Sequence, residues 1–564
     1  MTPQPLARRT VLAGGATAAG VSTVGLPALR ADAAARPVFA HGVASGDPLP
    51  AGALIWTRVT PTADAAPGSG RGPTVTVGWQ VAADPDFRRV VRHGAFTTGP
   101  SRDHTVKVDV TGLDPATWYH YRFSYDGVRS RVGRLRTSPR RRATPDHLRF
   151  GVVSCANLQA GWFSAYRHLA RRDDLHAVLH LGDYLYEYGP GEYGYGQTNE
   201  DIRPHEPAHE MVSLADYRRR HAQYKTDPDL QDLHARYPWI VTWDDHEVTN
   251  DQWRDGAENH QDDEGDYRRR RARAHRAYDE WMPVRLSGTA RLRDGTRLFR
   301  RLRFGRLAEI SMLDLRSYRD RQVAQPAPPA PWPDAEVSDP GRTILGARQL
   351  RWLRDSLRGS RPQWKIIGNP VMIAPVAFGA LPQELVGPVN DVTGLLPENG
   401  APYNVDQWDG YTADRRQVLR HLADHAVTDA LFVTGDIHSG WACELPLDAS
   451  TYVYDNPART SVGVEFVCSS VTSNNLKDIT GDPTGETSTV VEEAIKANNR
   501  HVRYLNFDDH GFSVLDVNRR RAQMDWYVIG DRADRDAPAT WETSWRTRSG
   551  TGRIEQVATP LADA

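Results

Sequence analysis

Cysteine is scarce in this chain, which has 564 residues and only three cysteines, Cys155, Cys443 and Cys468. At most one disulfide can form, because an odd count of cysteines leaves at least one thiol unpaired. Cys443 and Cys468 could form one bridge or lie buried as small residues, and the sequence does not choose between these states. Cys155 directly follows an apolar run, so it is the cysteine best placed for chemistry.

The chain also lacks an excess of charge of either sign. Its 70 Lys and Arg residues offset 71 Asp and Glu residues, which leaves a formal net charge of −1. Without a global field, stable binding of nucleic acid or of an anionic membrane is not expected. Beyond the N-terminus no segment has about 20 uninterrupted apolar residues, so we expect no transmembrane segment in the mature chain. An anionic substrate must therefore be bound by local groups.

The N-terminal residues are typical of an export signal. Arg8 and Arg9 precede a stretch rich in Ala, Gly and Val that ends at Leu29, and residues 31–33 offer a small-residue cleavage site. This pattern resembles a twin-arginine signal. We predict a signal peptide over 1–33 that the twin-arginine export machinery recognises, and a mature protein that is secreted, extracellular or periplasmic. Such export carries folded proteins, which suits a metal site filled in the cytoplasm.

The sequence after the signal predicts a small all-β domain over 36–138. A chain of this length is expected to form two or three domains. Short runs of strand-forming residues, separated by Gly, Pro and Asp turns, indicate a sandwich of the fibronectin or immunoglobulin type. A linker over 137–145, rich in Pro and Arg, ends it. The expected strands are 54–57, 74–79, 104–110 and 118–125.

Beyond the linker, apolar strands alternate with helices, which indicates an α/β layer structure. We predict a catalytic domain over 146–535 and a C-terminal tail over 536–564. Insertions at 190–209 and 326–340 are long enough that we expect them to shape a binding site. The arginine-rich helix expected over 267–281 is interpreted as a solvated face beside an apolar seam.

Acids, tyrosines and histidines directly follow several of the apolar runs. Because ligands bind outside the carboxyl ends of strands in an open α/β sheet, we expect these groups to converge there. Cysteine, aspartate, tyrosine and histidine together predict a mixed metal site. The runs and the groups that follow them are 148–154 before Cys155, 178–181 before GDYLY at 182–186, 239–243 before DDHE at 244–247, and 430–434 before GDIH at 435–438.

These motifs offer different kinds of donor atom. A carboxylate such as Asp183 can bridge two cations, while the phenolate of Tyr186 and the thiolate of Cys155 suit iron. The adjacent acids Asp244 and Asp245 would repel each other unless a cation or a basic partner compensates. Each motif alone also has a simpler explanation, as a turn, a helix N-terminus or a core cysteine, and only their convergence favours a site.

Histidines complete the two later motifs. Asp436 and His438 stand two residues apart, so their side chains project to one side of an extended loop and can each serve a different ion. His246 is placed to act on the substrate as an electrophile or a general acid.

Taken together, the motifs resemble the PhoD-type alkaline phosphatases and phosphodiesterases, a branch of the calcineurin-like metallophosphoesterases. They occur in the same order, with a further similar segment at 39–48. The resemblance implies a four-layer α/β/β/α catalytic domain and a site that contains ferric iron (Fe3+) and calcium (Ca2+). It implies Cys155, Asp183, Tyr186 and His438 around the iron, Asp183, Asp245 and Asp436 around calcium, and His246 near the phosphoryl oxygen and the leaving group.

Some positions depart from that pattern. Asp245 stands where related metallophosphatases carry asparagine, and Asp244 remains an alternative ligand. The further histidine of purple-type enzymes has no clear match, and Asn369, at an expected strand end, takes a plausible position whose oxygen favours calcium. The segment 313–319 resembles another family signature, in which Arg316 or Arg319 either contacts the substrate phosphate or forms a structural ion pair. Arg319 is the arginine we predict to be catalytic.

We therefore predict a secreted metal-dependent phosphoesterase in which a metal-activated hydroxide attacks phosphorus. The substrate stays open between monoesters and diesters, and among small molecules, phospholipids cleaved in a phospholipase D-like reaction and wall polymers. The alternative is a non-catalytic, calcium-binding extracellular protein that binds a polymer. Cys155 and Tyr186 argue against it, because a structural calcium site uses other oxygen ligands and no thiolate. We expect a monomer.

Overall fold

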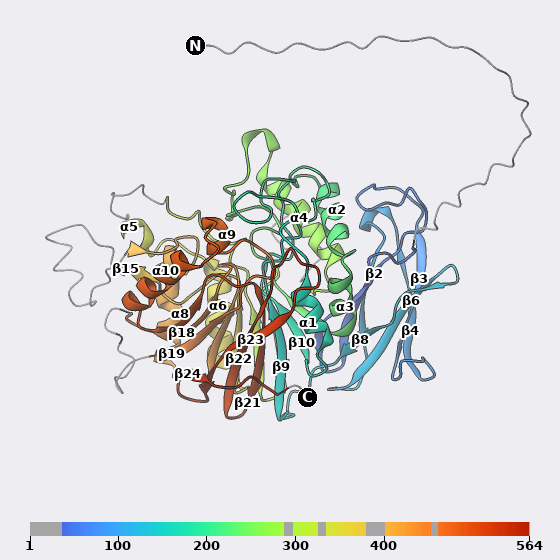
Figure 1. Ribbon diagram of the computed structural model, residues 1–564. Coiled ribbons are helices and arrows are strands. Elements are labelled where there is room, and N and C mark those ends of the chain that lie inside the picture. Colours follow the sequence, from blue (N-terminus) through green and yellow to red (C-terminus); the bar gives the residue numbers. More distant parts are fainter. Residues whose placement is uncertain are drawn as a thin grey trace, which may run out of the picture. The chain divides into compact units, whose positions relative to one another are not determined.

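Two large β-sheets lie at the centre of the computed structural model (Figure 1). The structure describes residues 37–286, 297–324, 334–378, 401–449, 452 and 461–562. The predicted signal peptide and residues 326–333 of the second insertion lie outside these residues. Within these described ranges, no helix combines the length and the apolar composition needed to cross a membrane.

The larger sheet has ten strands in the order β24-β23-β22-β21-β9-β10-β11-β1-β2-β5. Its central strands β9, β10 and β11 are parallel, and they are the apolar runs that precede Cys155 and the first two acidic motifs. Their bounds are His147–Val153, Ala177–His180 and Pro238–Val241. The other strands are β1 (Val43–Leu49), β2 (Gly52–Arg58), β5 (Thr105–Thr111), β21 (Gly511–Asn518), β22 (Arg521–Ile529), β23 (Ala539–Arg548) and β24 (Ile554–Val557).

The smaller sheet has seven strands in the order β12-β13-β14-β17-β19-β18-β20. Within it β14 and β17 are parallel, and β17 is the run that precedes the third motif. The strands are β12 (Arg300–Phe304), β13 (Ala308–Met312), β14 (Trp364–Asn369), β17 (Ala430–Thr434), β18 (Gly440–Pro446), β19 (Ser461–Val467) and β20 (Val502–Asn506), and a separate pair joins β15 (Ala377–Phe378) to β16 (Ala401–Pro402).

The N-terminal strands do not form a sandwich that is closed on itself. One layer is a five-stranded sheet, but β1, β2 and β5 of the facing layer belong to the ten-stranded sheet, because β1 pairs with β11 in parallel at Ser45↔Pro238. An apolar core that includes Ile55, Val77 and Tyr121 fills the space between the two layers. The five-stranded sheet contains β3 (Val75–Ala82), β4 (Val90–Thr98), β6 (Trp118–Tyr125), β7 (Val128–Arg129) and β8 (Gly133–Arg136).

The C-terminal segment also differs from the prediction of a tail over 536–564. Strands β23 and β24 lie in this segment and form one edge of the ten-stranded sheet. The alternation of apolar and polar residues in Ala539–Arg548 is typical of a strand with one covered face.

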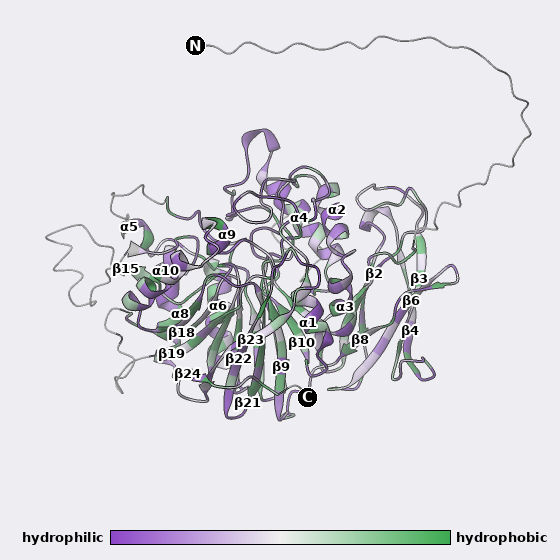
Figure 2. Ribbon diagram, viewed as in Figure 1, coloured by the Kyte–Doolittle hydropathy of each residue, from purple (hydrophilic) through white to green (hydrophobic). Residues whose placement is uncertain are grey.

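Three apolar cores separate the layers. Alternate residues of β9 and β10 point to opposite faces, so Phe150 and Leu179 pack against Ile310 and Val433 of the smaller sheet. Residues that point to the other face of the ten-stranded sheet, such as Val153 and Val178, pack against α1 (Ser164–Arg171), α2 (Leu214–Tyr224), α3 (Pro228–Arg236) and α4 (Tyr267–Trp281). Helices α6 (Gly346–Gly359), α8 (Thr412–Asp424) and α10 (Glu486–Asn498) cover the smaller sheet. Figure 2 shows apolar residues along the strands and hydrophilic residues along α4.

Several helices begin at residues whose side chains cap the first turn. Ser213 and Asp216 form a capping box at the start of α2, and Asp227 caps α3 ahead of a proline. The helices are α1 (Ser164–Arg171), α2 (Leu214–Tyr224), α3 (Pro228–Arg236), α4 (Tyr267–Trp281), α5 (Asp334–Val337), α6 (Gly346–Gly359), α8 (Thr412–Asp424), α9 (Leu476–Thr480) and α10 (Glu486–Asn498), with 3-10 turns at Pro100–Arg102, Asp262–Glu264 and Trp408–Gly410.

Candidate functional site

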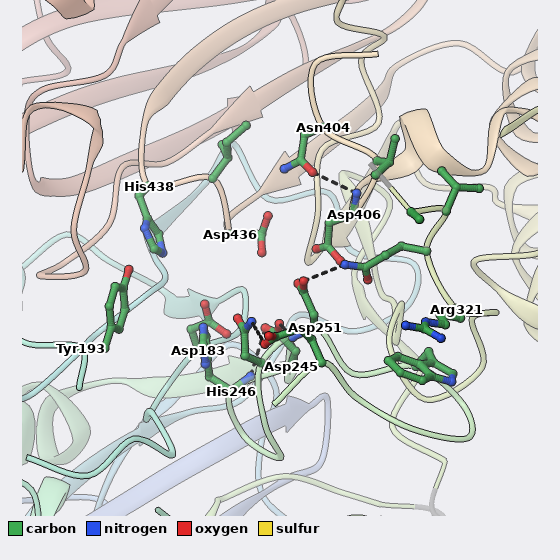
Figure 3. Close-up of a pocket in the computed structure, with 18 of the residues that line it drawn as sticks. Asp183, Tyr193, Asp245, His246, Asp251, Arg321, Asn404, Asp406, Asp436 and His438 are labelled. Atoms are coloured by element: carbon green, nitrogen blue, oxygen red, sulfur yellow. Dashed lines mark hydrogen bonds between the residues drawn. The ribbon is translucent and has the colours of Figure 1, made fainter. Parts of the chain in front are cut away.

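The motifs that follow the parallel strands meet around one cavity of about 550 Å³ (Figure 3). It lies beyond the carboxyl ends of strands from both sheets, where ligands of α/β proteins bind. Cys155 and Tyr186 are fully buried behind this lining. The residues that line the cavity and were predicted for the site are Asp183, Asp245, His246, Asp436 and His438.

The backbone at the strand ends is tightly turned. Gly182 has a φ of +116°, and a Cβ atom there would lie 2.5 Å from the Cβ of Asp244. A Cβ at Gly435 would lie 2.7 Å from that of Ser154. Both glycines thus allow loops from neighbouring strands to approach closely. Four predicted ligands have left-handed backbone angles, a conformation that concentrates at functional sites: Cys155 (58°), Asp183 (55°), Asp436 (68°) and His438 (53°).

One group of donors joins the first and the third motif. Cys155, Asp183 and His438 each place a ligand atom within 4.8 Å of the other two. The hydroxyl of Tyr186 lies 3.1 Å from Oδ2 of Asp183 and 3.4 Å from Nε2 of His438. A thiol, a carboxylate, a phenol and an imidazole therefore surround one position.

His438 is oriented by the backbone of the loop after β19. Its Nδ1 lies 2.7 Å from the carbonyl oxygen of Asn474. Because a carbonyl only accepts, Nδ1 carries the proton and the lone pair of Nε2 faces Tyr186. Burial lowers the pKa of His438 to about 4, so the ring is neutral and able to bind a metal. Arg532 fixes the loop by donating to Oδ1 of Asn474 at 2.6 Å.

A second group consists of acids alone. Asp183, Asp244, Asp245 and Asp436 place oxygen atoms within 4.8 Å of one another. Both oxygens of Asp244 accept from Arg316, at 2.5 Å from Nε and 2.8 Å from Nη2. Asp245 instead lines the cavity. Asp183 belongs to both groups, so it stands where one carboxylate can bridge two cations.

The chemistry of these donors fits bound cations. Oδ1 of Asp183 is buried and has no hydrogen-bond partner among the described residues. Burial and the neighbouring charge of Asp183 raise the pKa of Cys155 well above its usual value, and they do the same for Tyr186. Burial also raises the pKa of Asp183 and of Asp436 well above the usual range. A cation would compensate these charges and displace the protons.

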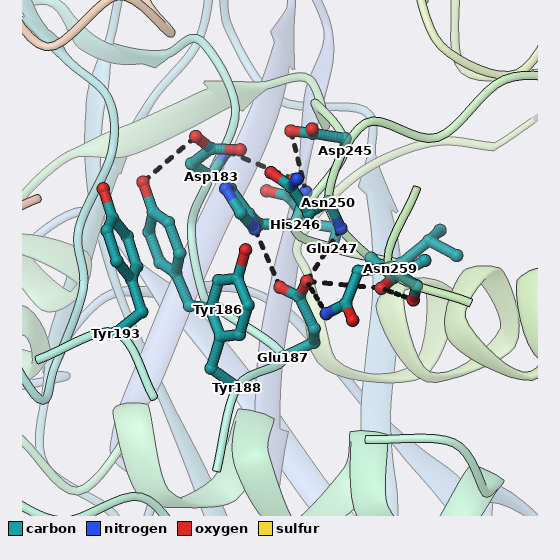
Figure 4. A network of polar contacts seen from close by, with 12 residues as sticks. Asp183, Tyr186, Glu187, Tyr188, Tyr193, Asp245, His246, Glu247, Asn250 and Asn259 are labelled. Atoms are coloured by element: carbon teal, nitrogen blue, oxygen red, sulfur yellow. Dashed lines mark hydrogen bonds and ion pairs between the residues drawn. The ribbon is translucent and has the colours of Figure 1, made fainter. Parts of the chain in front are cut away.

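His246 is paired with the buried carboxylate of Glu187 (Figure 4). Its Nδ1 lies 2.7 Å from Oε2 of Glu187. Burial alone would raise the pKa of Glu187, but the charge of His246 and several hydrogen bonds outweigh it and lower this pKa to about 2. Burial opposes the charged form of His246, but Glu187, Asp245 and Asp183 hold its pKa well above 6.5.

Sequence reasoning missed Glu187, although it directly follows Tyr186. It also missed Glu247, whose carboxylate accepts from the backbone N–H groups of Asp183, Tyr184 and Asp244 and so ties two motifs together. The sequence did offer a signal for both residues: Glu187 is an acid directly after one ligand motif, and Glu247 is the last acid of another.

Arg319 and Asn369, both predicted for the site, do not line the cavity. Arg319 is buried and donates to the carbonyls of Gln252 and Asp406 and to Gln322, so it positions loops and does not face the cavity. Asn369 ends β14 as expected, but its Oδ1 accepts from Trp408 at 3.2 Å and its amide donates to Thr434 and Glu465.

None of the three cysteines forms a disulfide bond. Cys155, Cys443 and Cys468 are all free and buried, so Cys443 and Cys468 do not form a bridge. Cys468 lies 3.4 Å from the hydroxyl of Ser154, next to Cys155.

Comparison with known proteins gives a consistent result. The family model of the PhoD-like phosphatases matches residues 150–526, and the model of their N-terminal domain matches residues 25–139. Alkaline phosphatase D of Bacillus subtilis (strain 168) is 36% identical over 492 residues, which cover 87% of this chain and 77% of that protein. A solved structure of PhoD is 32% identical, covers 93% of this chain and 92% of its own, and superposes with a TM-score of 0.79.

Proposed function

The chain belongs to the PhoD-like phosphatase family and is a phosphoesterase, and on this premise we propose that its site holds ferric iron and calcium around Asp183. The observation that carries the proposal is that Asp183 is shared by donor groups of different chemistry. One group contains sulfur and nitrogen, one contains only carboxylates, and a third joins Asp183 and Asp245 to His246.

Cys155, Asp183, Tyr186 and His438 are the proposed iron ligands. A thiolate and a phenolate are electron-rich donors that suit ferric iron, and the lone pair of His438 Nε2 faces the same position. Calcium would be served poorly by sulfur and nitrogen, since it prefers oxygen.

Asp183, Asp245 and Asp436 are the proposed calcium ligands. Asp244 is left out because both of its oxygens accept from Arg316 and it does not line the cavity, whereas Asp245 and Asp436 do. Arg316 also donates to Oδ1 of Asp436 at 2.9 Å, so one guanidinium fixes two of the acids behind the site. Asn369 is not proposed as a ligand, because its side chain is bonded on both ends to the protein interior.

When bound, the cations would act as Lewis acids on the phosphoryl oxygens and activate water. His246 holds the proton that the leaving group needs. Nδ1 is paired with the carboxylate of Glu187, so Nε2 is the atom that can donate into the cavity, and the charge of Glu187 favours the protonated ring. Glu187 is a positioning residue that supports this state.

Several finer points belong to the same proposal. We infer a four-layer arrangement from the three apolar cores, and export through the twin-arginine pathway from residues 1–33. Replacing Arg8 and Arg9 with lysine should then keep the protein inside the cell. Both monoesters and diesters are proposed substrates, since the cavity of about 550 Å³ has room for a second substituent.

The test combines metal analysis with two substrates. Purified protein should contain iron and calcium, and should hydrolyse p-nitrophenyl phosphate and bis(p-nitrophenyl) phosphate. Asp183→Asn should lose both metals and turnover while it keeps its circular dichroism spectrum. Calcium without iron in active protein, or full activity in Asp183→Asn, would overturn the mixed site.

A further inference from the structure

Arg321 is the one arginine or lysine among the described residues that line the cavity. Its guanidinium lies over the indole ring of Trp253, 5.1 Å from the ring centroid. Its backbone carbonyl accepts from Arg342 at 3.0 Å, which fixes the main chain at this point. Stacking on an aromatic ring holds a guanidinium in place while its N–H groups stay available for an anion.

The acids that share this lining have other partners in the described part of the chain. Asp406 forms ion pairs with Arg316 at 2.6 Å and with Arg319 at 2.7 Å. Asp251 accepts from Gln322, and Glu258 accepts from Asn250. No hydrogen bond or ion pair joins the guanidinium of Arg321 to any described residue. Arg321 is exposed, so its charge is available to an anion that enters the cavity.

Arg321 is also close to the reaction centre along a short chain of contacts. Its neighbour Gln322 donates to Oδ2 of Asp251 at 2.7 Å, and the N–H of Asp251 donates to Oδ2 of Asp245 at 2.6 Å. Asp245 is a proposed calcium ligand. Figure 3 shows Arg321 on the opposite side of the cavity from Tyr193 and His438. A substrate bound at the metals can thus extend toward Arg321.

We propose that Arg321, stacked on Trp253, is a subsite for a second anionic group of the substrate, and that the enzyme favours phosphoesters that carry such a group. This rests on the proposed function and adds a substrate class to it. A phosphate or a carboxylate would satisfy the planar N–H fork of the guanidinium. A substrate without the second anion would leave this cation facing water.

Matched substrates test the subsite. Butyl phosphate, 1,4-butanediol bisphosphate and 4-phosphooxybutanoate differ only in the group at the far end, and longer diols vary the reach. The wild type should show a kcat/KM about 10- to 100-fold higher for a bisphosphate of suitable length than for the alkyl phosphate, as one charge-assisted contact provides. The carboxylate compound shows whether phosphate is required.

The decisive measurement is the ratio of these two kcat/KM values. In Arg321→Gln the ratio should fall toward one, and Arg321→Lys should restore part of it. Arg254→Gln is the matched control, because Arg254 is an exposed neighbour outside the lining, paired with Asp255 and Asp320. An unchanged ratio in Arg321→Gln, or an equal fall in Arg254→Gln, would overturn the subsite.

Failure of the proposed function would look different. If the metal-loaded wild type hydrolysed none of the compounds, the reaction would be misassigned. Calorimetric binding of 1,4-butanediol bisphosphate and of butyl phosphate would then still decide the subsite. Tighter binding of the bisphosphate to the wild type and not to Arg321→Gln would support it, and equal affinities would overturn it.

Discussion

Nδ1 of His246 lies 2.7 Å from Oε2 of Glu187, and the two side chains are 9% and 0% exposed. The imidazole also packs against the ring of Tyr186, with centroids 4.1 Å apart. Glu187 follows Tyr186 directly, so one short segment carries both a proposed iron ligand and the partner of the proposed acid. The metal site and the proton donor are therefore positioned by the same loop.

Glu187→Gln should weaken the proton donor. The amide cannot supply the charge that raises the pKa of His246, while burial still lowers it, so the alkaline limb of the kcat profile should move to lower pH. We expect kcat at pH 8 to fall by ~10²-fold or more. Since Glu187 is not a proposed metal ligand, metal content should be unchanged.

The same pair makes stability depend on pH in a defined direction. Because the folded pKa of His246 lies above 6.5, the stabilisation is complete below pH 6.5 and is lost as pH rises through the folded value. Thermal unfolding of the wild type and of Glu187→Gln measures this. Thr249→Val is the control, because it removes a 3.2 Å contact to Oε1 of Glu187 and leaves His246 paired. In the kinetic measurement, an alkaline limb of the kcat profile that Glu187→Gln does not shift would contradict the role of Glu187.

Asp244→Asn and Asp245→Asn should separate the two adjacent acids. Asp245→Asn should lose calcium and turnover, because this carboxylate faces the cavity. Asp244→Asn should retain calcium but lower the free energy of unfolding by up to about 3–5 kcal/mol, because the substitution removes a charged partner of the buried Arg316. Metal analysis and thermal unfolding give the two readouts. The reverse pattern of calcium loss would make Asp244 the ligand.

Much of the site could be predicted because its residues follow apolar runs directly. The run 178–181 predicts a buried strand, and the carboxyl end of a strand in an α/β sheet is a binding position, so Asp183 could be placed near Asp436 without knowing the contacts between them. The strand ends at β9, β10, β11 and β17 agree with this.

Contacts between distant residues could not be predicted in the same way. Glu187 and His246 are 59 positions apart in the sequence, and no local sequence pattern predicts that they form a pair. Asn369 does end a strand, but its side chain bonds to Trp408 and Glu465 in the interior. The position of a residue at a strand end does not determine the direction of its side chain. The pairing of β1 with β11 is equally non-local, so the N-terminal sandwich was expected to stand alone.

Lys225 should make the protein less stable at neutral pH than at alkaline pH. It is buried against Tyr184 and His234, and burial lowers its pKa from 10.5 to about 7. Between these values the unfolded chain binds more protons than the folded one, so the free energy of unfolding rises with pH across that window. The gain should be on the order of a few kcal/mol.

Lys225→Met isolates this contribution. The variant keeps a long apolar stem beside Trp56 and has no charge to bury. Its thermal unfolding temperature should exceed that of the wild type at pH 6.5, and the difference should shrink toward pH 10. Lys496→Met serves as the control, since Lys496 is only partly buried and is paired with Glu493 at 2.8 Å. A difference between wild type and Lys225→Met that does not vary with pH would refute the prediction.

The proposed iron ligands should give the concentrated protein a visible colour. Phenolate and thiolate bound to ferric iron absorb visible light by charge transfer from ligand to metal, which neither calcium nor zinc can produce. Tyr186→Phe keeps the packing volume against His246 but deletes the oxygen, so the band should shift or vanish while the domain stays folded. Cys155→Ser should also shift the absorption band.

Tyr193→Phe is the matched control, because Tyr193 lies beside Tyr186 with ring centroids 5.7 Å apart and is not a proposed ligand. Iron-replete protein without a visible band, or a band that Tyr186→Phe and Cys155→Ser both leave unchanged, would show that these residues do not bind the iron.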